Sequence, residues 1–271
     1  MKKLSKIISL VLVAVLITAV FAGCGNTKDD VEETKDGSTT QAVVSEALAD
    51  GKLVVGTNAE FPPFEFLGDD GKPDGFDMAL MKEIGKILDV EITIENMEFK
   101  SLLGAMGNRI DVIAAAMTVK EERLLAVDFS DSYYTATQYV IAQKDSELAI
   151  ESIDDLAGMK IGVQEGTTGD FIATDDIENS KVSRFKKGVD AVIDLRNGKI
   201  DVVIIDSNPS MEYVSLYNDI EIIAKDIFEP EYYAIALPKG DTVLADAINN
   251  ALKTLKDNGK YDELIEMYIN K

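Results

Sequence analysis

The feature that most constrains the fold is an alternation of short apolar segments with longer amphipathic ones between Lys52 and Lys271. Five segments have the length and composition of strands, namely 53–56, 91–94, 111–114, 160–163 and 201–205. Helical spacing connects the apolar residues of four others, namely 76–88, 99–106, 189–196 and 243–269, the last broken near Asn258 and Gly259. Such alternation predicts an α/β fold with mostly parallel sheets, and about 220 residues favour division into two lobes.

The N-terminal segment is built differently from the rest. A basic start precedes an apolar run over 7–22, and small residues lead to Cys24, the only cysteine. This order is typical of a secretory signal with a lipid-modified cysteine at the cleavage site. The run of about 16 residues is shorter than the ~20 that a membrane-spanning helix needs. We therefore expect 1–23 to be a lipoprotein signal peptide and 24–51 to be a lipidated Cys24 with a polar, flexible tether.

Composition excludes some partners and chemistries. The chain has 49 Asp and Glu residues against 27 Lys and Arg residues, a formal net charge of -22. So acidic a protein repels nucleic acid. The chain also contains no His, which argues against a zinc or copper site and against a His-dependent catalytic triad. We expect no metal and no cofactor.

A first candidate site lies around Arg123. Thr118 precedes Glu121 at the spacing of a capping box, which predicts that a helix begins at Thr118. Arg123 follows within about one turn. The unpaired N–H groups of a helix start, together with a guanidinium, are typical of a carboxylate or phosphate site. The alternative is an ordinary surface ion pair between Arg123 and Asp128 or a neighbouring Glu.

A second candidate of the same kind follows the predicted strand 160–163. Thr167 and Asp170 have nearly capping-box spacing, and Gly166 and Gly169 allow close approach of a ligand to the backbone. This loop is either a second anion site or an ordinary connection from strand to helix.

Two further side chains stand at the carboxyl ends of predicted strands, where α/β proteins place ligand-contacting groups. Phe61 lies in a loop that Pro62 and Pro63 stiffen, so it either lines a pocket or packs into the local core. Asp206 ends the strand 201–205, where it can contact a ligand, cap the following helix, or do both.

Taken together, these segments resemble the family 3 extracellular solute-binding proteins, the amino-acid receptors of ABC importers. The resemblance covers nearly all of 52–271, and the segments that carry it are 55–58, 61–65, 75–77, 97–99, 110–112, 118–123, 127–130, 161–163, 166–168, 198–202 and Asp206. It implies a two-lobed, type II periplasmic-binding-protein-like fold with its ligand in the cleft between the lobes. The lobes would be 52–139 plus 235–271 and 140–234, joined by two hinge crossovers near 139–141 and 233–235.

The resemblance also assigns the groups that would hold the backbone of an amino acid. Arg123 would pair with the α-carboxylate, which the backbone N–H groups of Thr118 and Thr168 would share. Asp206 would take the α-ammonium together with the backbone carbonyl of Ala116. Opposite charges would thus meet opposite ends of a zwitterion.

The remaining implied contacts concern the ligand side chain. Phe61 and Phe99 would sandwich it, and Gln164 would face the cleft as a specificity position. Many members of the family that bind basic or amide side chains carry Asp where this chain has Asn58. Asn58 is neutral, so a polar, neutral L-amino acid is favoured over arginine or lysine, although Glu60 lies nearby and could substitute.

We therefore expect a monomeric, non-enzymatic binding protein that delivers a free amino acid to an ABC permease. It would be extracytoplasmic, lipid-anchored through Cys24 to the outer face of the cell membrane. One alternative is a cyclohexadienyl-dehydratase-like enzyme on the same fold, with Glu60 or Glu165 as proton donor. Another is a sensor domain, although the transmembrane helix and cytosolic domains of a sensor kinase are missing from the sequence.

Overall fold

The computed structural model describes residues 45–270. The predicted signal peptide 1–23, the lipidation site Cys24 and nearly all of the tether 24–51 lie outside these residues. Within the described range, no helix is both long and apolar enough to cross a membrane.

Lobe 1 is built on a five-stranded mixed sheet. The order of its strands is β5 (Glu91–Asn96), β1 (Lys52–Thr57), β6 (Val112–Ile113), β15 (Ala236–Pro238) and β7 (Val127–Phe129). Strand β1 runs parallel to β5 and β6, whereas β15 runs antiparallel to β6 and β7. The helical segments of this lobe are η1 (Glu46–Leu48), α1 (Phe76–Leu88), η2 (Phe99–Ser101), α2 (Leu102–Ala105), α3 (Glu121–Leu124), α7 (Thr242–Asp257) and α8 (Lys260–Tyr268).

Helix α1 shows how the apolar spacing builds lobe 1. Phe76, Leu80 and Ile84 recur every four residues and are fully or almost fully buried. Ile87, which the predicted apolar face included, is 40% exposed. That part of the prediction was wrong because the helix ends one residue later, at Leu88, and its last turn reaches the surface.

Lobe 2 is built on a second five-stranded mixed sheet. Its order is β11 (Lys181–Phe185), β10 (Lys160–Gln164), β12 (Val202–Asp206), β9 (Gln138–Gln143) and β13 (Ile220–Ala224). Strand β10 runs parallel to β11 and β12, and β9 runs antiparallel to β12 and β13. The helical segments are η3 (Ile153–Leu156), α4 (Thr168–Phe171), η4 (Ile172–Asp176), α5 (Gly188–Arg196) and α6 (Ser207–Leu216).

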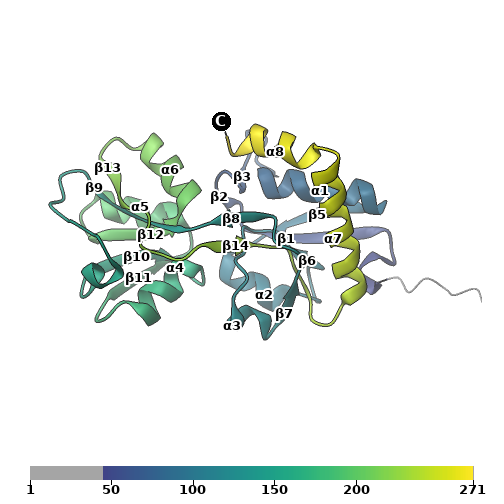
Figure 1. The fold of residues 1–271 in the computed structure, drawn as a ribbon, viewed down its shortest axis with the longest axis horizontal. Coiled ribbons are helices and arrows are strands. Elements are labelled where there is room, and N and C mark those ends of the chain that lie inside the picture. The colour runs from purple at the N-terminus through teal and green to yellow at the C-terminus, as the bar shows by residue number, and fades with distance from the viewer. Residues whose placement is uncertain (1–44, 271) are drawn as a thin grey trace, which may run out of the picture. The chain divides into compact units, whose positions relative to one another are not determined.

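A narrow connection joins the two lobes. Strands β8 (Tyr134–Ala136) and β14 (Glu231–Tyr233) pair antiparallel as a two-stranded sheet, called here the connecting ribbon (Figure 1). The crossover expected at 139–141 lies inside β9, a few residues after the ribbon. The one expected at 233–235 starts at the last residue of β14. A small sheet of β2 (Glu60–Phe61), β3 (Glu65–Leu67) and β4 (Pro73–Asp74) completes the fold.

Aromatic side chains pack the ribbon against lobe 1. The ring centroid of Phe64 lies 4.9 Å from that of Tyr134 in β8 and 5.2 Å from that of Tyr233 in β14, both edge-to-face. This geometry is favourable for aromatic pairs. Both strands of the connection therefore rest on one buried ring.

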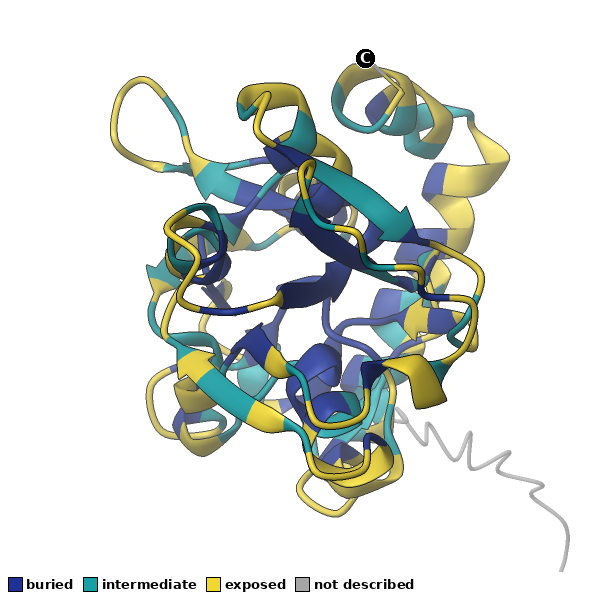
Figure 2. Ribbon diagram, turned by 90° about the vertical axis from the view of Figure 1, so that its left-hand side faces the viewer, coloured by how far each residue is buried: buried dark blue, intermediate teal, exposed yellow. Residues whose placement is uncertain are grey.

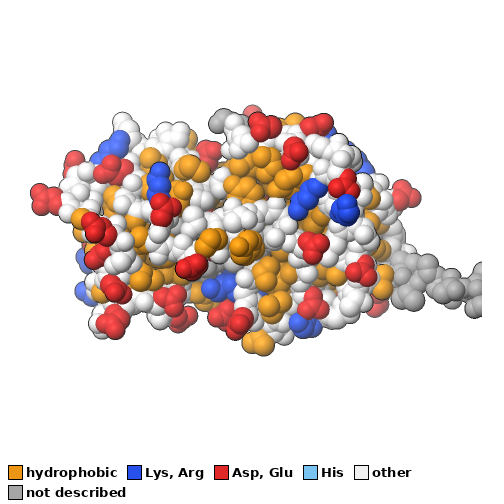
Figure 3. Space-filling view, viewed as in Figure 1, with side chains coloured by type: hydrophobic (Ala, Val, Ile, Leu, Met, Phe, Trp, Pro, Cys, Tyr) orange, Lys and Arg blue, Asp and Glu red, His pale blue; other side chains and the backbone are white. Residues whose placement is uncertain are grey.

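Most charged side chains lie at the surface of this fold, although a few are buried, among them Arg123, Asp206 and Glu231. Figure 2 shows buried residues on the central strands, whereas the edge strands, such as β11, and the surrounding helices and loops carry intermediate and exposed residues. Figure 3 shows Asp and Glu scattered over one face rather than gathered in a single patch. On this face the acidic side chains are therefore spread out.

Candidate functional site

A cavity between the lobes brings together all nine residues singled out from the sequence. Its empty volume is about 290 Å³. Lobe 1 and lobe 2 both contribute to its walls, and the lining residues are Asn58, Phe61, Phe99, Ala115, Ala116, Thr118, Arg123, Gln164, Thr167, Thr168 and Asp206.

Arg123 is buried at the cavity wall, with only 3% of its surface exposed. Its Nη1 donates to the carbonyl of Thr118 at 2.7 Å and its Nη2 to the carbonyl of Gly166 at 3.1 Å. The guanidinium carbon lies 5.4 Å from the ring centroid of Phe99. A guanidinium has five N–H donors, and these two bonds use two of them. The alternative of a surface pair with Asp128 does not hold, because Asp128 pairs with Lys239.

Arg123 remains protonated although it is buried. Burial lowers the pKa of this guanidinium to about 10, while the negative charges of Glu231 and Asp206 oppose that effect. Arg123 is therefore still a cation at neutral pH. A buried, partly solvent-excluded cation next to a cavity is suited to receive an anionic group.

The predicted capping box at Thr118 does not form. Helix α3 begins at Glu121, and its N-cap position is Lys120, with no side-chain capping bond. Thr118 instead pairs with Tyr233 in an isolated antiparallel bridge, and its hydroxyl donates to Glu231 Oε2 at 2.5 Å. The prediction was wrong because pairing with the ribbon keeps Thr118 extended and turns its hydroxyl towards a buried carboxylate.

The second predicted capping pair is also rearranged. Helix α4 begins at Thr168, but the hydroxyl of Thr167 donates to the carbonyl of Gln164 at 2.8 Å. Asp170 Oδ2 accepts from the backbone N–H of Gly166, which has a positive φ of 81°, at 3.0 Å. The hydroxyl of Thr168 donates to that of Thr118 at 3.2 Å, which joins the two loops across the cavity.

Asp206 lies at the end of β12 and is buried. Its Oδ1 accepts from the hydroxyl of Tyr233 at 2.5 Å, and it makes no side-chain cap on α6. Burial and then repulsion from Glu231 raise the pKa of Asp206 to about 7. A neighbouring cation would favour its ionised form. Asp206 is thus suited to a ligand ammonium.

Glu231 was missed by the sequence reasoning. It is 6% exposed, and its Oε1 accepts from Gln138 Nε2 at 2.9 Å. It stands in a short acidic segment, Glu229-Pro230-Glu231, which reads as a surface turn. The strand that it begins has three residues, too few for a periodic pattern to reveal burial. Only its position just before the predicted crossover at 233–235 could have pointed to it.

The far end of the cavity carries neutral polar groups. Gln164 Nε2 donates to Asn58 Oδ1 at 2.7 Å, and Asn58 Nδ2 donates to the carbonyl of Met97 at 2.8 Å. Gln164 Oε1 is buried without a hydrogen-bond partner among the described residues. The sequence left open whether Phe61 lines a pocket or packs into the local core. In the structure it does both, since it lines the cavity and belongs to the lobe 1 core.

The backbone at Ala116 has an uncommon conformation for a residue other than glycine, with a φ of 45°. Its N–H donates to Asp77 Oδ2 at 2.8 Å, and the hydroxyl of Tyr133 donates to the same oxygen at 2.6 Å. Burial raises the pKa of Asp77 to about 6, and burial together with the charges of Asp77 and Asp206 raises the pKa of Glu65 well above its ordinary value. Sequence patterns gave no signal for this buried carboxyl pair.

The two candidate proton donors of the enzyme alternative are engaged elsewhere. Glu60 pairs with Lys187 at 2.6 Å and Glu165 with Lys100 at 2.9 Å. Neither is among the residues that line the cavity. Both pairs join lobe 1 to lobe 2. Among residues 45–270 there is also no cluster of three or more metal-binding side chains.

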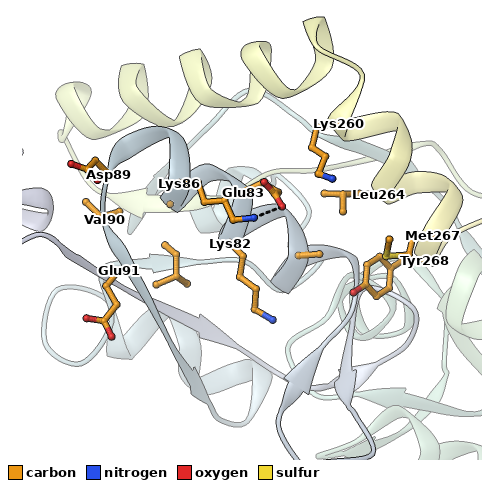
Figure 4. A pocket seen from close by; sticks show the side chains of 13 residues that line it. Lys82, Glu83, Lys86, Asp89, Val90, Glu91, Lys260, Leu264, Met267 and Tyr268 are labelled. Atoms are coloured by element: carbon orange, nitrogen blue, oxygen red, sulfur yellow. Dashed lines mark hydrogen bonds and ion pairs between the residues drawn. The ribbon is translucent and has the colours of Figure 1, made fainter.

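A larger groove lies on the outside of lobe 1, between α1, β5 and α8 (Figure 4). Its empty volume is about 1220 Å³, and Lys86 pairs there with Glu83 at 2.8 Å. It contains none of the nine predicted residues. The cavity between the lobes is therefore the candidate site.

Comparison with known proteins agrees with this fold. A crystal structure of a mutant of ArgBP from T. maritima superposes with a TM-score of 0.78 at 41% identity, and covers 83% of this chain and 98% of its own. The structure of an ancestral arginine-binding protein bound to glutamine has a TM-score of 0.74 at 36% identity, and covers 82% and 99%. The predicted two-lobed α/β fold is thus confirmed.

Proteins with similar sequences identify the family. A protein named probable histidine-binding protein from Neisseria gonorrhoeae is 33% identical over 87% of this chain and 90% of its own length. The model of a family of solute-binding proteins matches residues 53–271, which also confirms the prediction of a binding protein rather than an enzyme. The chain belongs to the bacterial extracellular solute-binding proteins, family 3.

Proposed function

We propose that the protein captures the zwitterion of a polar L-amino acid in the cavity between the lobes. The observation that carries this proposal is the separation of charge in one cavity, with the cation of Arg123 and the carboxylate of Asp206 on its walls. Arg123 would bind the α-carboxylate, together with the backbone N–H groups of Thr118 and Thr168. Asp206 and the carbonyl of Ala116 would bind the α-ammonium.

The far end of the cavity defines the ligand side chain. Gln164 Oε1 is a buried acceptor without a partner in the described chain, and such a group is costly unless a ligand supplies a donor. Asn58 and Gln164 carry no charge that could balance a cation there. Asn58 differs from the Asp that many amide-binding members of the family carry, but the buried acceptor Gln164 Oε1 could take an amide N–H in its place. We therefore favour a neutral side chain with N–H donors, glutamine first, held between Phe61 and Phe99. The proteins compared above are named for histidine or arginine or contain glutamine, and all three side chains carry N–H donors.

Transport follows from the family and from the proposed ligand. The lobes, 52–139 plus 235–271 and 140–234, would close on the amino acid about the connecting ribbon, and the closed form would deliver it to an ABC permease. We further propose that 1–23 is removed as a signal peptide and that lipid on Cys24 holds the monomer at the outer face of the cell membrane. Labelling with radioactive palmitate tests the anchor, because a Cys24→Ser variant should incorporate none.

A thermal-shift screen of the twenty amino acids and cystine tests the ligand assignment. A ligand that binds only the folded state raises the melting temperature in a concentration-dependent way. Glutamine or another neutral amide or hydroxyl amino acid should give the largest rise. A larger rise with arginine or lysine would contradict the neutral preference, and no rise with any compound would contradict amino-acid binding.

A further inference from the structure

Glu231 occupies an unusual place for an acidic side chain. It is the first residue of β14 in the connecting ribbon and lies opposite Ala136 of β8. The neighbouring Glu229 is exposed, whereas Glu231 is buried. A buried carboxylate is costly unless it is well hydrogen-bonded. Its partners therefore show what its burial achieves.

Those partners belong to the two lobes. Glu231 Oε2 accepts from the hydroxyl of Thr118 at 2.5 Å, in lobe 1. Glu231 Oε1 accepts from Gln138 Nε2 at 2.9 Å, at the first residue of β9, which is a strand of the lobe 2 sheet although the expected lobe bounds would count Gln138 in lobe 1. Gln138 also stands opposite Asp206 in the register of β9 and β12. One carboxylate thus joins the lobe 1 wall of the cavity to the strand next to Asp206.

The charge of Glu231 acts on the same two groups that would hold the zwitterion. It is the largest electrostatic influence that favours the charged form of Arg123, ahead of Asp206. It is also the largest influence of another charge on Asp206. Glu231 is therefore connected to the site in two ways. Its hydrogen bonds hold Thr118 and Gln138, and its charge acts on Arg123 and Asp206.

We propose that Glu231 is a positioning residue for ligand binding, which holds Thr118 and Gln138 on either side of the ribbon in the closed arrangement of the lobes. This inference rests on the proposed amino-acid function. Without Glu231, the hydroxyl of Thr118 and the amide of Gln138 lose their buried acceptor, and the two walls of the cavity lose a shared contact.

The test compares calorimetric affinities of Glu231→Ala and Glu231→Gln with those of Glu229→Ala and Glu229→Gln, which make the same changes at an exposed position nearby. Glu231→Ala should weaken binding roughly 10- to 100-fold, because it strands two buried polar groups. Glu231→Gln should retain most of the affinity, since Gln138 can turn its amide and offer Oε1, which otherwise has no partner among the described residues. If the affinity of Glu231→Ala for the ligand lies within twofold of that of Glu229→Ala, the inference is overturned.

The dependence of ligand affinity on pH distinguishes this role from a merely structural one. It is measured on Glu231→Gln, so it also tests the inference if Glu231→Ala does not fold. The groups that face Asp206 are Glu231 and Tyr233 from β14, Arg123 from α3 and Glu65 from β3. Wild-type affinity should fall as the pH drops below about 7, because protonated Asp206 cannot pair with an ammonium. In Glu231→Gln this fall should begin at lower pH, whereas Glu229→Gln should keep the wild-type profile.

The outcomes distinguish this inference from the proposed function. If the wild-type protein binds no amino acid, the proposed function fails. If the wild type binds and Glu231→Gln follows the wild-type pH profile, only the role of Glu231 fails.

Discussion

At the scale of single residues, Arg123 shows what the sequence could and could not predict. Its proximity to a cavity followed from the order of motifs along the chain. Its partners did not, because the carbonyls of Thr118 and Gly166 are brought to it by tertiary contacts between two loops. A capping-box pattern is local, and at Thr118 a longer-range pairing with Tyr233 overrides it. The resemblance to the solute-binding family therefore pointed to Arg123 as a cavity residue, whereas local spacing did not predict its hydrogen bonds.

Replacing Arg123 tests the anionic end of the ligand. In Arg123→Ala, a bound α-carboxylate would be buried without its counter-charge, so binding of every amino acid should weaken by about 3–5 kcal/mol. Calorimetry measures this loss, and Arg109→Ala, which removes an exposed arginine paired with Glu95, should leave the affinity unchanged. Equal affinities of Arg123→Ala and wild type would remove Arg123 from the site.

Replacing Asn58 tests how the cavity recognises the side chain of the ligand. Asn58→Asp places a negative charge beside Gln164 in the cavity, which should favour arginine and lysine relative to glutamine. The readout is the ratio of the affinities for arginine and glutamine. Asn108→Asp adds the same charge at an exposed position and serves as control. An unchanged ratio in Asn58→Asp would mean that Asn58 does not contribute to specificity.

At the scale of elements, the long periodic segments were predictable and the short ones were not. Helices α1, α7 and α8 and the parallel strands lie close to their predicted ranges, because many apolar residues repeat in each. Strand β15 in lobe 1 and strand β9 in lobe 2 run antiparallel to both of their neighbours, which makes both sheets mixed, whereas the other four strands of each sheet share one direction, as expected for mostly parallel sheets. Strands of two or three residues, such as β8 and β14, are too short to show a period, so the ribbon and Glu231 needed the structure.

The start of α1 provides a test at this scale. Gly75 has a φ of 121°, and a Cβ there would lie 2.3 Å from the backbone oxygen of Phe64. Gly75→Ala should therefore lower the free energy of unfolding by about 1–3 kcal/mol. Gly104→Ala, in α2, meets no atom within 4 Å and should not destabilise. Denaturant titration measures both, and equal stabilities would show that α1 does not require this turn.

At the scale of the whole molecule, buried carboxyl groups give the protein a distinctive pH response. The pKa of Asp206 is raised to about 7, that of Asp77 to about 6, and that of Glu65 well above its ordinary value, in each case mainly by burial. Between about pH 4 and 7 the folded state therefore binds more protons than the unfolded chain. The free energy of unfolding then decreases as the pH rises through this range.

The ligand-free protein should accordingly melt at a higher temperature at pH 5 than at pH 8. The acidic surface contributes in the same direction through charge repulsion, so a variant is needed to isolate the buried groups. In Asp77→Asn, which cannot ionise, the difference between the two melting temperatures should be smaller than in wild type. A wild-type melting temperature that rises with pH, or an Asp77→Asn difference as large as that of wild type, would contradict this account.

The central claim is that one cavity clamps both charges of an amino acid, and calorimetry with altered ligands tests it most directly. L-Glutamine should bind with a stoichiometry of one at pH 8, where Asp206 is ionised. Its α-amide, which lacks the carboxylate for Arg123, and its N-acetyl derivative, which lacks the ammonium for Asp206, should each bind far more weakly. Binding of both derivatives as tightly as L-glutamine, or no binding of L-glutamine at all, would contradict the account.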